Sequence, residues 1–166
     1  MFHKASMAGR YIYMSGTRYW VVKTEPEVYP WERLVAEGGV EWDGVRNYQA
    51  RNHLRSMKNG DLVIVYHSNS NPPGAIGVAI VDREAGADPT QFDPNSPYYD
   101  PGSNLEDPRW SSVHIVPVRG LELVPLETLR NLPQLHGSAL TAKGNRLSVS
   151  ELTYSGFQAI VETGSK

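Results

Sequence analysis

The chain has no cysteine among its 166 residues, which excludes disulfides, thiolate zinc sites and cysteine nucleophiles. It also lacks long hydrophobic runs. The longest, "GAIGVAIV" at 74–81, has the length of a strand and falls far short of the ~20 apolar residues that cross a bilayer. The N-terminal stretch "MFHKASMAGRYIYM" lacks the apolar core of a signal peptide. We therefore expect no membrane partner and a cytoplasmic location, or a nuclear one in a eukaryotic host.

An excess of one charge is missing too. Sixteen Lys and Arg residues against eighteen Asp and Glu residues give a net charge of -2. A polyanionic partner would therefore have to bind at a local basic patch. The fingerprints of phosphate-binding loops, dinucleotide-binding turns, zinc proteases and serine hydrolases are absent. The five histidines never pair at metal-ligand spacing. We expect neither a metal nor a cofactor.

The length fits one domain, which we place at 17–163, after a loose N-terminal extension at 1–16 consistent with a misplaced start codon. Strands are predicted at about 18–23, 61–68, 74–85, 112–126 and 145–152. Helices are predicted from Pro30 to Gly38, from Asn47 to Gly60, at 125–132 and at about 154–162. Strands scattered among short helices indicate an α+β fold with a curled, mostly antiparallel sheet that closes as a small barrel.

Residues 82–108 differ in composition from the rest. They hold seven carboxylates, five prolines and one cation, Arg83. A loop of this length in a compact domain is usually functional or disordered.

A basic helix is predicted within "EWDGVRNYQARNHLRSMKNGD", residues 41–61. Ala50, Leu54 and Met57 recur at helical spacing and form its apolar stripe. Each of these three residues is followed directly by a cation, so the three cations form a second ridge along the helix. A fourth cation lies near the helix start. Together they are candidates to neutralise phosphates: Arg46, Arg51, Arg55 and Lys58. A solvated helix face explains the same pattern.

Two tryptophans, Trp42 and Trp110, stand where a loop meets a regular element. Two parallel indole planes could hold one flat base between them, and stacking contributes roughly 1–3 kcal/mol per base. Both could instead be core residues.

Hydrogen-bonding side chains accompany these rings: Asn47, Gln49, Asn52, Thr24 and Ser68. Paired donors and acceptors can read the edge of a base. The alternative makes Asn47 a helix cap and leaves Gln49 and Asn52 in solvent.

Long stretches of the chain resemble the EVE domain, a PUA-like family. They are "YWVVKTEP", "EWDGVRNYQARNHLRSMKNGDLVIVYHS", "GAIGVAIV", "SPYYDP", "PRW" and "GNRLSV", in the family's order and spacing over about 19–149. The resemblance implies a curled or closed β-barrel of about five to six strands. It also implies non-catalytic recognition of a modified base in DNA or RNA, such as 5-methyl- or 5-hydroxymethylcytosine, in an aromatic pocket.

Carried over residue by residue, the resemblance implies the following base-binding residues: Lys23, Thr24, Glu25, Trp42, Asn47, Asn52, His67, Ser68 and Trp110. The chain departs from the family at Thr24, where Ser is frequent, and at Ser150, where Gln is usual. Thr24 keeps the hydroxyl.

Two other functions stay open. Glu25, Asp43 or His67 could transfer protons in a hydrolase or glycosylase acting on a modified nucleoside. The acidic loop could also be a protein-binding surface. In the favoured reading the chain is a monomer that binds nucleic acid carrying a modified base.

Overall fold

The computed structural model describes residues 6–7, 10–11 and 16–165. Most of the predicted extension at 1–16 lies outside these residues. Its described part forms an antiparallel pair of two-residue strands, β1 (Ser6–Met7) and β2 (Arg10–Tyr11).

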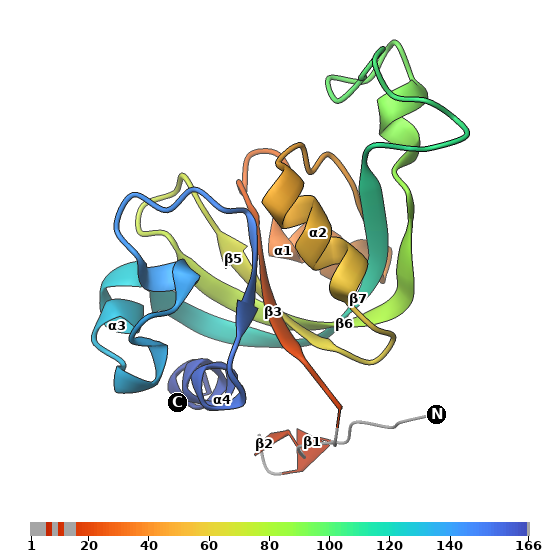
Figure 1. Ribbon diagram of the computed structural model, residues 1–166. Helices are drawn as coiled ribbons and strands as arrows, with labels where there is room; N and C mark the ends of the chain where they lie inside the picture. Colours follow the sequence, from red (N-terminus) through yellow and green to blue (C-terminus); the bar gives the residue numbers. More distant parts are fainter. Residues whose placement is uncertain (1–5, 8–9, 12–15, 166) are drawn as a thin grey trace.

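The main sheet has six strands in the order β4-β7-β6-β5-β3-β8, shown in Figure 1. Only β3 and β5 pair in parallel, and the other neighbours are antiparallel. The predicted α+β class and the mostly antiparallel sheet are confirmed. The strands are β3 (Tyr19–Thr24), β4 (Val40–Trp42), β5 (Leu62–His67), β6 (Gly74–Ala87), β7 (Ser111–Pro125) and β8 (Val149–Leu152). The α-helices are α1 (Trp31–Glu37), α2 (Tyr48–Ser56), α3 (Leu126–Arg130) and α4 (Tyr154–Thr163).

Helices cover both faces of the sheet, so its central strands are buried on both sides. Along β3, Tyr19 and Val21 join a core that includes α3 and α4, whereas Trp20 and Val22 join a core that includes α1 and α2. This alternation follows from the two-residue period of a strand. It explains why the central strands read as continuous apolar runs.

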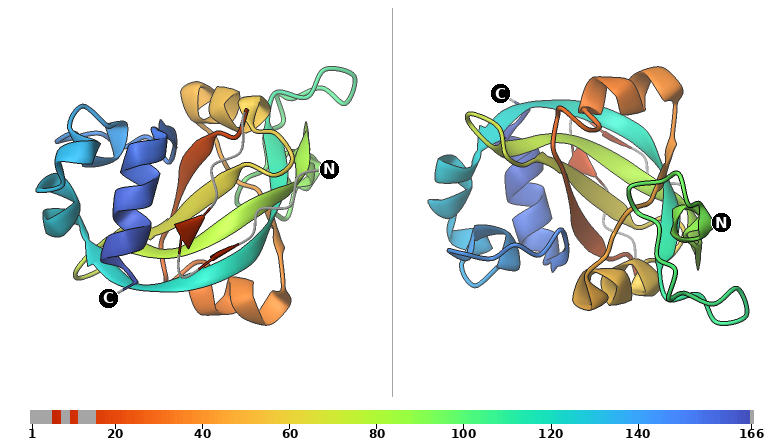
Figure 2. Two further views of the ribbon diagram at one scale, coloured as in Figure 1. Left: turned by 90° about the horizontal axis from the view of Figure 1, so that it is seen from below. Right: turned by 90° about the horizontal axis from the view of Figure 1, so that it is seen from above.

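The sheet curls without closing, so the predicted closed barrel is wrong. Register shifts interrupt the β6–β7 ladder at several points, and such bulges bend and twist a strand pair. Helix α2 contacts β8, which is one edge strand, and β7, which lies next to the other edge. Its buried residues Ala50 and Leu54 share a core with Val113 and Val149 from those strands. A helix therefore fills the space across which the edge strands would have to pair (Figure 2).

Several boundaries and one strand differ from the prediction. Helix α2 ends at Ser56 rather than near Gly60, because Met57 is extended and the Lys58 N–H donates to Asp61 Oδ2 at 3.0 Å. Strand β4 is only three residues long and was missed. Strand β6 continues to Ala87, so the connection between β6 and β7 comprises residues 88–110.

Candidate nucleic-acid interface

A cavity of about 1200 Å³ opens among β3, β4, the start of α2 and the residues after β5. It exceeds the ~300–1,000 Å³ usual for small-molecule pockets and could admit a nucleotide. Of the predicted base-binding residues, Lys23, Thr24, Glu25, Trp42, Asn47 and Ser68 line it. Arg46 and Asp43 line it as well. The remaining predicted residues, Asn52, His67, Trp110, Arg51, Arg55 and Lys58, are not among its lining.

Two aromatic residues, Trp42 and Tyr29, are among those that line the cavity. Trp42 ends β4, where pairing with Val113 fixes its backbone, and its side chain is buried except for a small exposed part. The ring of Tyr29 meets it edge-on, with centroids 6.3 Å apart and planes at 89°. Burial and a hydrogen bond to Glu37 raise the pKa of Tyr29 to about 12, so its hydroxyl stays a donor at neutral pH.

The polar lining is only partly free to contact a ligand. The Thr24 hydroxyl already donates to the Tyr29 carbonyl at 3.0 Å. Asn47 Oδ1 accepts from the Ala50 N–H at 2.9 Å, which confirms its capping role and leaves its amide NH2 to donate. Burial lowers the pKa of Lys23. Burial, and then the nearby charge of Asp88, raise the pKa of Asp43, which lines the cavity.

His67 serves the fold instead of the cavity rim. Its Nε2 accepts the Trp31 N–H at 3.1 Å, so it satisfies a backbone donor of the first turn of α1, which Pro30 cannot cap with a side chain. Burial lowers the pKa of His67, which favours the neutral ring that this hydrogen bond requires.

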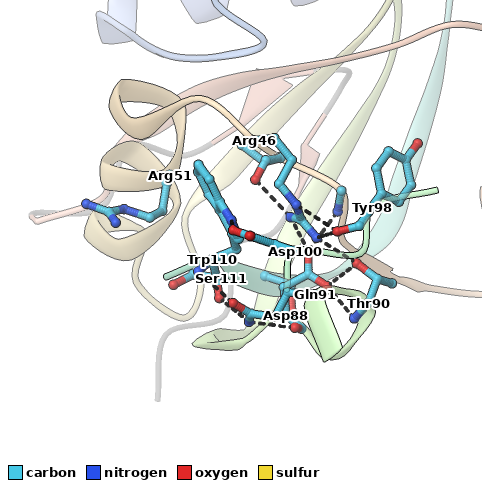
Figure 3. A network of polar contacts seen from close by, with 12 residues as sticks. Arg46, Arg51, Asp88, Thr90, Gln91, Tyr98, Asp100, Trp110 and Ser111 are labelled. Atoms are coloured by element: carbon cyan, nitrogen blue, oxygen red, sulfur yellow. Dashed lines mark hydrogen bonds and ion pairs between the residues drawn. The ribbon is translucent and has the colours of Figure 1, made fainter. Parts of the chain in front are cut away.

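Trp110 is not among the residues that line the cavity, so the structure does not bring it together with Trp42 there. Its ring is stacked on Tyr48, with centroids 4.9 Å apart and planes at 22°, and its Nε1 donates to Asp100 Oδ2 at 2.7 Å. The Arg46 guanidinium lies 5.4 Å from the indole centroid. Figure 3 shows Trp110 between Arg46 and helix α2, within a polar network.

All N–H donors of the Arg46 side chain are used inside that network. Nε donates to the Tyr98 carbonyl, Nη1 to the Val45 carbonyl and to Asp88 Oδ2, and Nη2 to Thr90 Oγ1 and again to the Tyr98 carbonyl. A guanidinium offers five donors. Arg46 lines the cavity but has none left for a phosphate unless this network rearranges.

The other predicted phosphate ligands also contact the protein. Arg51 Nη1 donates to the Arg109 carbonyl at 3.0 Å, and Arg55 Nε donates to Ser111 Oγ at 2.9 Å. Arg51 also donates to Asn52 Oδ1, which occupies the acceptor of that amide. Lys58 lies near Glu84 at 3.9 Å, with 68% of its side chain exposed. Arg51 and Arg55 thus hold the returning end of the β6–β7 connection against α2.

The sequence reading missed the two residues around which that connection folds, Asp88 and Gln91. Asp88 Oδ2 accepts from the Gly44 N–H and Arg46, while Oδ1 accepts from the N–H and hydroxyl of Thr90. Burial alone would raise the pKa of Asp88, but these hydrogen bonds outweigh it and lower the pKa. The order Asp-Pro-Thr is a helix-start signal that could have identified this turn.

Gln91 is fully buried and uses its whole amide. Nε2 donates to the carbonyls of Asp88 and Trp110, and Oε1 accepts from Ser103 Oγ and the Trp110 N–H. The acidic connection is therefore an ordered structure.

Neither a metal site nor a membrane span is found in the part of the chain that the structure describes. Its His, Asp and Glu residues form no group of three or more that could hold a metal ion. None of its helices combines the length and apolar character that a bilayer crossing demands.

The open α+β sheet carries a cavity beside the end of β3, and residues 18–163 match the EVE domain. The chain belongs to this PUA-like family, as the resemblance predicted. It is 39% identical over 164 residues to mouse thymocyte nuclear protein 1, covering 87% of this chain and 73% of the relative.

Solved structures agree with this assignment. A hypothetical protein from Leishmania major is 36% identical with a TM-score of 0.86, covering 90% of this chain and 95% of the other. The human THYN1 protein in complex with DNA containing 5-methylcytosine is 37% identical with a TM-score of 0.80, covering 90% and 98%.

Proposed function

We propose that this domain is a non-catalytic reader of nucleic acid, which accepts an extruded modified base, such as a modified cytosine, in the cavity walled by Trp42 and Tyr29. The observation that carries the proposal is an open cavity whose lining includes two aromatic residues and several polar side chains. The family supports it, since a relative with 37% identity has been solved with DNA containing 5-methylcytosine.

Stacking in such a cavity can offset part of the cost of extruding a base. Extruding a base costs a few kcal/mol of pairing and stacking, least for a single-stranded or mismatched base. Stacking on one ring returns roughly 1–3 kcal/mol. With Trp110 outside the lining, Trp42 supplies the ring face, and the edge of Tyr29 closes one side. Asn47 and Asp43 are the nearest candidates to read the base edge, through an amide donor and a carboxyl group respectively.

The test measures the ratio of affinities for matched oligonucleotides with and without 5-methylcytosine, in duplex DNA and in single-stranded RNA. Trp42→Leu keeps apolar volume in the core but removes the ring. We expect it to lower affinity for the modified strand by about 5- to 150-fold, the equivalent of 1–3 kcal/mol of stacking. Trp110→Phe is the matched control and should preserve the ratio. A folded Trp42→Leu protein with the parent ratio would refute the proposal.

An enzyme remains the second candidate, because Asp43 and Glu25 line the cavity and the pKa of Asp43 is raised. His67 is a weaker candidate, since its Nε2 already accepts the Trp31 N–H. A mass change in a modified oligonucleotide that is lost in Asp43→Asn would favour catalysis. The monomeric state and the cytoplasmic or nuclear location remain predictions.

A further inference from the structure

A second set of cations lies on the segment between α3 and β8. Residues 128–150 contain no carboxylate, but they contain Arg130, His136, Lys143 and Arg146. All four side chains are exposed. We call these four residues the basic segment.

The basic segment borders the cavity. Arg146 and Asn145 line the cavity itself, and Asn145 also lines a neighbouring pocket of about 600 Å³ that Arg130, His136 and Lys143 surround. The two hollows are therefore adjacent, with cations continuing from one to the other.

Unlike the cations of α2, those of the basic segment are free to bind a ligand. Among the described residues, Arg130, Lys143 and Arg146 take part in no ion pair, and Arg130 makes only a long hydrogen bond of 3.5 Å from Nε to the Thr141 carbonyl. By contrast, Arg51 and Arg55 donate to the β6–β7 connection.

The backbone that carries these cations is held in place. Leu135 and Leu140 are buried in the core beneath it, and the Thr141 hydroxyl donates to the Leu135 carbonyl at 2.9 Å. At the cavity end, the Lys23 N–H donates to the Ser148 carbonyl at 2.9 Å and ties the segment to β3. A fixed backbone lowers the entropy cost of binding.

We infer that the basic segment binds the phosphodiester backbone of the nucleic acid whose base enters the cavity. This inference rests on the proposed function and assigns the backbone contacts to a different element from the one predicted. Phosphate contacts position a nucleic acid, whereas contacts to the base specify it. In all views of Figures 1 and 2 the segment, drawn in blue, lies at the opposite end of the molecule from the green 88–110 connection that Arg51 and Arg55 hold.

The inference predicts a change in salt dependence. Each phosphate contact contributes about -0.9 to the slope of log K against log salt for duplex DNA and about -0.7 for a single strand. Lys143→Gln combined with Arg146→Gln should therefore reduce the slope by about 1.8 on DNA and about 1.4 on RNA. Between 50 and 200 mM salt, the loss of DNA affinity should be about tenfold smaller than in the parent.

The experiment titrates fluorescent duplex DNA and matched single-stranded RNA at salt concentrations across that range, by anisotropy. Lys58→Gln is the matched control, because it removes an exposed cation beyond the end of α2 and should leave the slope unchanged. An unchanged slope in the double variant, or an equal decrease in Lys58→Gln, would overturn the inference.

The two proposals fail separately. A loss of the preference for modified DNA tests the cavity proposal. The salt slope can be measured on unmodified duplex and tests the backbone contacts of the basic segment. A slope that falls on DNA but not on RNA, or the reverse, would identify the polymer while supporting the backbone assignment.

Discussion

Removing the charge of Asp88 should destabilise the domain and disturb one wall of the cavity. The Asp88 side chain is fully buried. Its hydrogen bonds from the Gly44 N–H and Arg46 join the segment before α2 to the β6–β7 connection, and two more from Thr90 lie within that connection. Asp88→Asn keeps the shape of the side chain but replaces one acceptor oxygen with an NH2 group. If the NH2 replaces Oδ2, it faces two donors, the Gly44 N–H and Arg46. If it replaces Oδ1, it faces the Thr90 N–H, while the Thr90 hydroxyl can rotate to accept from it.

The expected loss of unfolding free energy is about 3 kcal/mol. Removing one partner of a buried ion pair typically costs about 3–5 kcal/mol. We take the low end, because the Arg46 side chain is 22% exposed and can recover some hydration. For a domain of this size, the melting temperature should fall by about 6–12 °C.

The assay is urea unfolding followed by tryptophan fluorescence at pH 7. Asp93→Asn is the control from the same connection, since Asp93 is exposed and its Oδ1 accepts one hydrogen bond, from the Asn95 N–H. It should change stability by less than about 0.5 kcal/mol.

Because the pKa of Asp88 is lowered in the folded state, its contribution to stability is present above the unfolded pKa and is lost as pH falls through the folded pKa. The difference between parent and Asp88→Asn should therefore shrink below about pH 4. A loss under 1 kcal/mol at pH 7 would refute the structural role of this network.

Two further predictions concern the packing of α1. Burial lowers the pKa of His67 in the folded state, so below about pH 6.5 the unfolded chain binds a proton more readily than the folded chain. The free energy of unfolding should therefore fall as pH drops from about 6.5 toward the folded pKa. His67→Gln can keep an acceptor for the Trp31 N–H without titrating, so its melting temperature should fall less between pH 7.5 and 5 than that of the parent. A Cβ at Gly77 would lie 2.6 Å from the Trp31 ring, so Gly77→Ala should cost about 1–3 kcal/mol in urea unfolding. Gly86→Ala, which meets nothing within 4 Å, should cost less than 1; equal losses would contradict the packing argument.

Local signals explain which parts of the fold were predictable. Helix α1 was placed correctly because an apolar repeat starts after Pro30 and ends at Gly38, whose φ of 75° suits glycine. Helix α2 began where predicted because Asn47 caps it. Its end was not predictable, because the hydrogen bond from the Lys58 N–H to Asp61 competes with a further helical turn.

Barrel closure and the role of Trp110 depend on contacts between distant segments. No local pattern shows that α2 packs between β7 and β8. Likewise, a tryptophan at the junction of a loop and a strand is compatible with a cavity wall or with stacking on Tyr48. Trp42 and the residues at the end of β3 line the cavity, because they end strands on that side.

The cations of α2 show why helical spacing alone could not assign their partner. Arg51 and Arg55 are four residues apart, as both a phosphate-binding ridge and a structural clamp require. Apart from Asn52, their acceptors lie at 108–111, more than fifty residues away, and are mostly backbone carbonyls, which every sequence contains. A run of cations without carboxylates therefore indicates phosphate binding only where the fold leaves the N–H donors of those cations without a protein acceptor. Residues 128–150 meet that condition, because their cations surround a pocket next to the cavity and make no ion pair within the described chain.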